Sequence, residues 1–208
     1  FSVNGELETA ITTDDDADGD LDLSFLMIMR PLDQSVPGGN PMDVTVGACT
    51  DPMAGTVCDA DPLDFQSAPY TNGDSGTCLD PITGTTGGYT PGITSPGPVC
   101  FSSAPFLLTL DMGGIQIPLS DVQVGATYVG SPAAQLTDGL LRGFISEADA
   151  DNTILPASLP LIGGNPLSSV LPGGSGSCQG GTLDSNNGVD GWWFYLNFPA
   201  DQVTYVGP

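Results

Sequence analysis

The feature that most restricts the fold is a series of short apolar segments with two-residue alternation, separated by glycine and proline. Residues 21–29, LDLSFLMIM, illustrate it, because every second side chain from Leu21 to Met29 falls on one face of an extended strand. The 29 glycines and 19 prolines among 208 residues favour turns and disfavour long helices. The pattern therefore predicts many short strands.

We expect eight or nine strands, and we expect residues 21–29 to be central because the second half of that segment is apolar on both faces. Gly113–Gly114 is a predicted hairpin turn. Ser146 with Asp149 predicts a short helix that ends at Pro156, and residues 166–174 predict one more helical turn. The predicted strands are 1–11, 21–29, 42–47, 105–112, 115–119, 121–129, 136–146, 191–198 and 201–206.

This pattern predicts an all-β fold, an antiparallel β-sandwich of jelly-roll type with one or two short helices. No composition break divides the chain, so residues 1–208 are expected to form a single domain. Residues 48–104 differ from the rest in local composition, since they are rich in Cys, Gly and Pro. We expect them to form a long loop excursion tied by disulfides.

The five cysteines favour disulfides in an oxidising compartment, because no histidine exists to complete a zinc site and no C-x-x-C pair occurs. Two bridges and one leftover thiol allow 15 arrangements. Proximity in the sequence favours Cys49–Cys58 and Cys78–Cys100, with Cys178 free or bonded outside the chain. We expect an extracellular or cell-surface location. The start at Phe1 suggests a processed or trimmed chain, and no apolar run is long enough for a transmembrane span.

The charge balance is strongly acidic, with Arg30 and Arg142 as the two basic residues and a net charge of -23. Such a charge repels phosphate, so nucleic acid and anionic membranes are poor partners. It also opposes compaction, which bound cations would relieve. Salt adaptation is a weaker alternative because only three of the 25 acidic residues are Glu.

One acidic run resembles the start of a calcium loop. Residues 14–22 read D-x-D-x-D-G-x-x-D, the spacing found in EF-hands, dockerins and thrombospondin type 3 repeats. Alternate carboxylates supply the oxygens that Ca²⁺ requires, and the glycine permits the sharp bend. The resemblance implies a calcium site formed by Asp14, Asp16, Asp18, Asp20 (through its carbonyl) and Asp22.

The twelfth position of that loop is Phe25, where an EF-hand has a bidentate Glu. The resemblance therefore implies neither an EF-hand fold nor a calcium sensor. The missing ligand would come from Asp15, Asp33 or a distant loop. The alternative is a solvated acidic turn.

Two further acidic clusters have two interpretations each. Asp184, Asn186 and Asp190 have the spacing of a second calcium site or of an Asx-rich turn. Residues 147–151, with Glu147, Asp149 and Asp151, could supply ligands, although first-turn acids also favour a helix N-terminus.

The segment GWWFYLNF (191–198) is apolar on both faces. We expect one face to pack in the core. The other, with Trp193 and Tyr195, could stack on sugar rings or seat a partner, or could be the second covered face of a central strand.

The composition excludes several kinds of catalytic site, and we expect that the protein is not an enzyme. The lack of His removes Ser-His-Asp and Cys-His arrangements, and the lack of Lys removes Schiff bases. A carboxylate-pair glycosidase remains in principle, with only three Glu available.

Residues 140–178 and 190–203 resemble parts of uncharacterised secreted or lipid-anchored proteins predicted in myxobacteria and related bacteria. The resemblance covers about a third of the chain and implies export to the surface or envelope, with no known activity. From the missing catalytic residues, the apolar strands, the candidate calcium site and the unpaired Cys178, we expect a calcium-stabilised structural or adhesive surface protein that self-assembles. The alternative is a carbohydrate-binding module that uses Trp193 and Tyr195.

Overall fold

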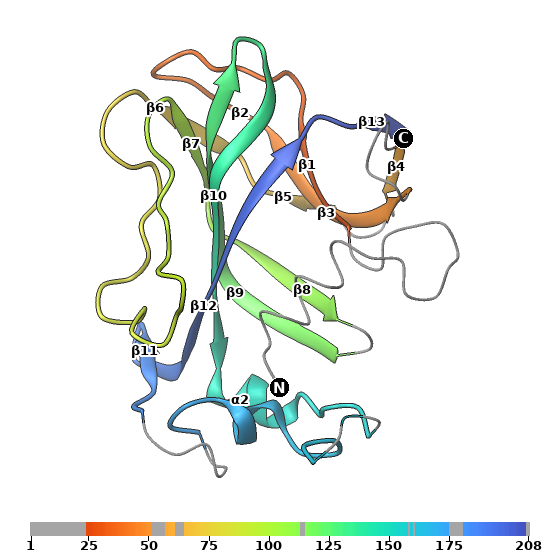
Figure 1. The fold of residues 1–208 in the computed structure, drawn as a ribbon, viewed down its shortest axis with the longest axis vertical. Helices are drawn as coiled ribbons and strands as arrows, with labels where there is room; N and C mark the ends of the chain where they lie inside the picture. Colours follow the sequence, from red (N-terminus) through yellow and green to blue (C-terminus); the bar gives the residue numbers. More distant parts are fainter. Residues whose placement is uncertain are drawn as a thin grey trace.

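Two β-sheets form the frame of the protein (Figure 1). The computed structural model describes residues 24–50, 57–60, 65–112, 115–157, 159, 161–174 and 181–206. The larger sheet has the order β11-β12-β10-β9-β7-β6-β2, and β8 pairs with β9. Its strands are β2 (Gly39–Asn40), β6 (Tyr70–Gly73), β7 (Cys100–Ser103), β8 (Phe106–Met112), β9 (Ile115–Gly130), β10 (Ala133–Ser146), β11 (Asp184–Asn186) and β12 (Val189–Asp201).

The smaller sheet has the order β1-β3-β4-β13, and β5 pairs with β3. Its strands are β1 (Ser24–Met29), β3 (Met42–Cys49), β4 (Val57–Ala60), β5 (Gln66–Ser67) and β13 (Thr204–Val206). All the pairings are antiparallel except that of β13 with β4. The predicted all-β class, with antiparallel sheets and little helix, is confirmed.

Three of the six neighbouring pairs in the order of the larger sheet follow one another along the chain, namely β11–β12, β9–β10 and β6–β7, and the other three are joined by longer connections. The predicted strands 115–119 and 121–129 are one strand, β9, of 16 residues. Asp121 adopts a left-handed φ of 49° within β9 and bends the strand without ending it.

Strand β1 differs from the expectation of a central strand. In the described part of the chain it ends the strand order of the smaller sheet and pairs with β3. Both faces are nevertheless apolar because each meets a different cluster. Leu26 packs with Cys49 and Cys58, whereas Phe25 and Met27 pack against the main core.

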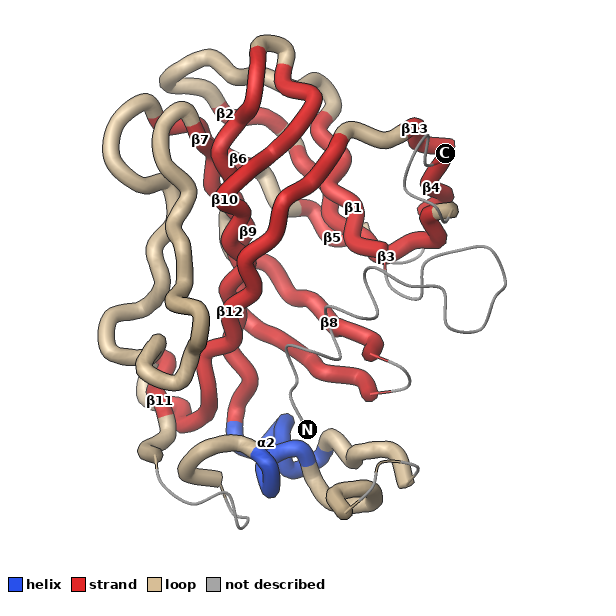
Figure 2. The backbone as a smooth tube through the Cα atoms, viewed as in Figure 1, coloured by secondary structure: helices blue, strands red, loops and turns tan. Residues whose placement is uncertain are grey.

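The predicted loop excursion, residues 48–104, is partly regular, because β4, β5, β6 and β7 lie inside it. The irregular part is residues 74–99, which we call the excursion. It runs beside β10 and β12 as the long loop in Figure 2. The smaller sheet lies on the other side of the larger one (Figure 1).

The helical predictions are confirmed in substance. Helix α2 (Glu147–Asn152) begins after Ser146, whose hydroxyl accepts from the Asp149 N–H at 3.0 Å. It ends four residues before Pro156, and a 3₁₀ turn follows at Leu167–Val170. No helix in the described ranges is long and apolar enough to cross a bilayer.

The larger sheet is buried on both faces. Adjacent residues on β10 show this, because Leu141 belongs to the core shared with the smaller sheet, whereas Leu140 belongs to a second cluster. The second cluster joins the sheet to Leu79, Ile82 and Tyr89 of the excursion. The excursion therefore covers one face of the sheet as a structural layer.

Candidate functional site

The face of β12 that carries Trp193 and Tyr195 is the surface that the sequence suggested for a sugar or a partner. Both rings are buried, with 7% of Trp193 and 1% of Tyr195 exposed. The expectation of exposed aromatic platforms is therefore wrong, because the excursion lies over this face. The alternative interpretation, a strand covered on both faces, describes these residues.

The hydroxyl of Tyr195 anchors the first half of the excursion. It accepts from the backbone N–H of Ile82 at 3.0 Å and lies 2.5 Å from Oγ1 of Thr85. Thr85 donates its own hydrogen to the carbonyl of Ile82, so Tyr195 is the donor in the short bond. A buried phenol thus has both its donor and its acceptor capacity used.

Tyr89 closes the free edge of β12. Its hydroxyl donates to the carbonyl of Trp193 and accepts from the N–H of Tyr195, both at 3.2 Å. The N–H of Trp193 donates to Oδ2 of Asp184 at 3.0 Å. Because β11 pairs only with residues 189–191, these side chains replace the missing neighbouring strand.

Asn197 attaches the second half of the excursion. Its side-chain oxygen accepts from the N–H of Thr94 at 2.8 Å, and its amide donates to the carbonyl of Thr94 at 2.7 Å. The same amide donates to the carbonyl of Gly139 on β10 at 2.8 Å. One exposed side chain therefore connects the excursion, β12 and β10.

Arg142 lies half-buried between the sheet and the excursion. It donates to the carbonyl of Asp80 and to Oε1 of Gln123, the latter at 2.6 Å, and its guanidinium lies 5.9 Å from the Trp193 ring centre. Burial lowers the pKa of Arg142 from its ordinary value. One of the chain's two cations is thus used to hold the excursion.

The ionisable groups of this face are arranged for packing. Hydrogen bonds from Thr77 and Ser95 hold the pKa of Asp80 below its usual range. Burial raises the pKa of Tyr89 to about 12 and also raises the pKa of Tyr195. Both phenols therefore stay neutral at physiological pH, as their hydrogen bonds require.

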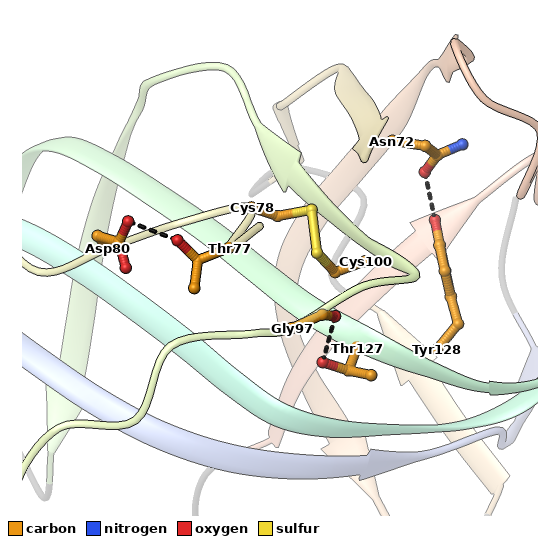
Figure 3. Close-up of a disulfide and its surroundings, with 8 residues drawn as sticks. All are labelled: Asn72, Thr77, Cys78, Asp80, Gly97, Cys100, Thr127 and Tyr128. Atoms are coloured by element: carbon orange, nitrogen blue, oxygen red, sulfur yellow. Dashed lines mark hydrogen bonds between the residues drawn. A yellow bond between two sulfur atoms is a disulfide. The ribbon is translucent and has the colours of Figure 1, made fainter. Parts of the chain in front are cut away.

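The Cys78–Cys100 disulfide anchors the excursion to β7 (Figure 3). Nearby, Oγ1 of Thr127 donates to the carbonyl of Gly97 at 2.9 Å. The two ends of the excursion also meet directly, because the N–H of Cys78 donates to the carbonyl of Pro96 at 3.1 Å. A second disulfide, Cys49–Cys58, joins paired residues of β3 and β4. Both predicted pairings are confirmed.

The predicted metal ligands are only partly described. The calcium-like loop, Asp14 to Asp22, lies outside the described residues, as does Cys178. Asp184 and Asn186 lie in β11, and Asp190 is paired with Ser185 in the β11–β12 hairpin. Asp184 caps the edge of β12, and Asn186 donates to Oδ2 of Asp121 at 2.5 Å. Within the described ranges, no group of three or more Cys, Asp or Glu could hold a metal ion.

The structural importance of Tyr89 and Asp184 was missed from the sequence. For Tyr89 a signal existed, because it is the only aromatic residue in the excursion, residues 74–99. For Asp184 none existed, since an edge cap and a metal ligand use the same carboxylate.

Comparisons with known proteins add no family to this description. No protein-family model matches the chain, and the searches of curated proteins and of solved structures each found no match.

Proposed function

We propose that this chain is an extracellular, calcium-stabilised structural or adhesive protein that self-assembles at the cell surface. The observation that carries the proposal is that each cover of the larger sheet has its own disulfide, Cys78–Cys100 in the excursion and Cys49–Cys58 in the smaller sheet. Disulfides persist in oxidising compartments and resist local unfolding. This design suits a durable protein outside the cytoplasm.

The role of calcium follows from charge. A chain with a net charge of -23 repels its own copies, and binding of divalent ions lowers that repulsion. The D-x-D-x-D-G-x-x-D run at residues 14–22 is the candidate site. Calcium at this run would both stabilise the fold and permit association.

The test measures melting temperature and particle size with millimolar calcium and with EDTA. If calcium is present at about 100 times its dissociation constant, it adds about 2.7 kcal/mol to the free energy of unfolding. For a chain of this size that corresponds to a rise of about 5–10 °C in melting temperature. Light scattering and electron microscopy should show assemblies that EDTA dissolves.

The variant Asp14→Asn, Asp16→Asn, Asp18→Asn should lose both responses, because calcium affinity depends on ligand charge. The matched control, Asp59→Asn, Asp74→Asn, Asp138→Asn, removes the same charge from exposed positions and should keep them. Asn tolerates the left-handed φ of 47° at position 138. A wild-type protein whose melting temperature and particle size ignored EDTA would contradict the proposal.

A further inference from the structure

A cleft of about 500 Å³ lies between the smaller sheet and the ends of β10 and β12. Strand β1 lines it along its whole length, and Leu136, Phe198 and Val203 line it from the other elements. This volume lies within the usual range of small-molecule sites, about 300–1,000 Å³. Most of its lining is apolar, so the cleft suits a hydrocarbon rather than a sugar.

Two residues that line this cleft have a buried hydroxyl without a hydrogen-bond partner. The two atoms are Oγ of Ser24, whose residue is 5% exposed, and Oη of Tyr205. Buried polar atoms are nearly always paired, because an unpaired one costs about 1–3 kcal/mol. The described chain has two other such atoms, Nε of Arg142 and Nε1 of Trp193, but these lie under the excursion and not in the cleft. Both hydroxyls are therefore unpaired, and a ligand seated against Ser24 or Tyr205 could supply the missing partner.

The cleft also contains a cation. The guanidinium of Arg30 lies 4.5 Å from the centre of the Tyr205 ring and lines the cleft. Among the described lining residues, Asp201 is the acidic one, and its Oδ1 already accepts from the amide of Gln135 at 3.0 Å. A guanidinium that lies over an aromatic ring can still donate hydrogen bonds from its N–H groups to a carboxylate.

We propose that this cleft binds a free single-chain amphiphile with a carboxylate head, of the long-chain fatty acid class. The chain would lie along Leu26 and Ile28, and the head would accept hydrogen bonds from Arg30 and Tyr205. Ser24, at the other end of β1, marks a second polar position about 20 Å away by strand geometry. This inference rests neither on calcium nor on self-assembly.

The charge of the chain favours a free ligand over a membrane. An anionic bilayer presents many charges to a protein of net charge -23, so the repulsion accumulates. A single carboxylate meets mainly the local field of Arg30, because charges beyond about 8 Å are screened at physiological ionic strength.

The test is displacement of a fluorescent fatty acid from the delipidated full chain. Dodecanoate and dodecanol share a hydrocarbon chain and differ in the head. We expect one saturable site per chain and an affinity at least about tenfold higher for dodecanoate, because its carboxylate makes a charge-assisted hydrogen bond that the hydroxyl of dodecanol does not. Vesicles of phosphatidylglycerol serve as the membrane arm and should not displace the probe.

Arg30→Gln should remove the preference for dodecanoate and leave dodecanol unchanged, whereas Arg30→Lys should keep part of the preference. Ile28→Trp should fill the cleft and abolish the binding of both dodecanoate and dodecanol. Its control is Leu107→Trp, at an exposed position on β8 outside the cleft. Arg30 is exposed, so its variants remain informative even if Ile28→Trp fails to fold. The proposal is overturned by any of three results: no saturable displacement, equal affinities that Arg30→Gln leaves unchanged, or displacement by vesicles alone.

Discussion

The smaller sheet and the excursion each cover one face of the larger sheet, but different kinds of hydrogen bond hold them in place. On one face the smaller sheet supplies regular strands, in which backbone groups pair with each other. On the opposite face the excursion supplies no strand, and side chains of β12 and β10 satisfy its backbone instead. Each cover has one disulfide, and each buries aliphatic or aromatic side chains of the sheet.

The difference shows where polar groups remain available. Under the excursion, the hydroxyls of Tyr195 and Tyr89 are fully used in fastening the cover. Beside the smaller sheet, the buried hydroxyl of Tyr205, a residue that lines the cleft, has no partner. Two buried donors, Nε of Arg142 and Nε1 of Trp193, are also unpaired under the excursion, but only Ser24 and Tyr205 line the cleft.

The largest expected effects come from neighbouring leucines on β10. Leu140→Ala empties the core under the excursion, and Leu141→Ala empties the core between the sheets. Both residues are at most 2% exposed, so each substitution should cost about 3–4 kcal/mol in urea unfolding. A cost below 1 kcal/mol for Leu140→Ala alone would show that the excursion does not form a true core layer.

Removal of the disulfides should rank next. Cys78→Ser with Cys100→Ser opens a separation of 22 residues, and Cys49→Ser with Cys58→Ser opens one of 9. The chain-entropy relation gives losses of about 3.4 and 2.6 kcal/mol. Limited proteolysis should then cut the reduced excursion first, because no strand pairing holds it. Preferential cutting at residues 57–60 in both double variants would contradict this difference.

The tyrosines provide a matched pair of smaller changes. Tyr195→Phe leaves the N–H of Ile82 unpaired and should cost about 1–3 kcal/mol. Tyr205→Phe removes a buried hydroxyl that has no partner, so it should leave the free energy of unfolding unchanged or raise it by up to about 1–3 kcal/mol. Equal losses in chemical denaturation would mean that the cleft hydroxyl is bonded in solution.

The smallest effect is expected at Asp80, which is exposed. Its pKa is lowered in the folded state, so its contribution to stability is present above its ordinary pKa of 3.8 and is lost as the pH falls through the folded pKa. Asp80→Asn should flatten the stability profile between pH 5 and pH 2 by well under 1 kcal/mol. An unchanged profile would mean that the bonds from Thr77 and Ser95 do not form in solution.

The sequence predicted the strands that alternate and the disulfides that are close in the chain. In segment 136–146 the two internal glycines and the Phe/Ile alternation favour a strand over a helix, and β10 confirms the strand. The helix cap at Ser146 was equally local. Such features depend on a few neighbouring residues.

What the sequence could not predict depends on contacts between distant residues. The place of β1 at the end of the strand order, among the described strands, follows from which strands pair, and periodicity carries no information on that. Burial of Trp193 depends on a segment about 100 residues earlier, which lacks any strand or helix pattern. The cleft, whose lining residues include two unpaired hydroxyls, likewise forms where β1, β12 and β13 come together.

The double burial of β12 has a consequence for how its alignment is specified. A strand with one apolar face is locked in place, because sliding it by one residue would expose that face. On β12, a slide would merely exchange Trp192 and Phe194 for Trp193 and Tyr195, and both sets are apolar.

Hydrophobic alternation therefore cannot fix the register of β12. The register must depend instead on steric fit and on polar contacts. Gly191 and Gly139 contribute, because a side chain at either site would collide with Ile145 or Phe198. Asn197 contributes through its three bonds to Thr94 and Gly139. The contacts between the excursion and β12 therefore help to specify the register of β12.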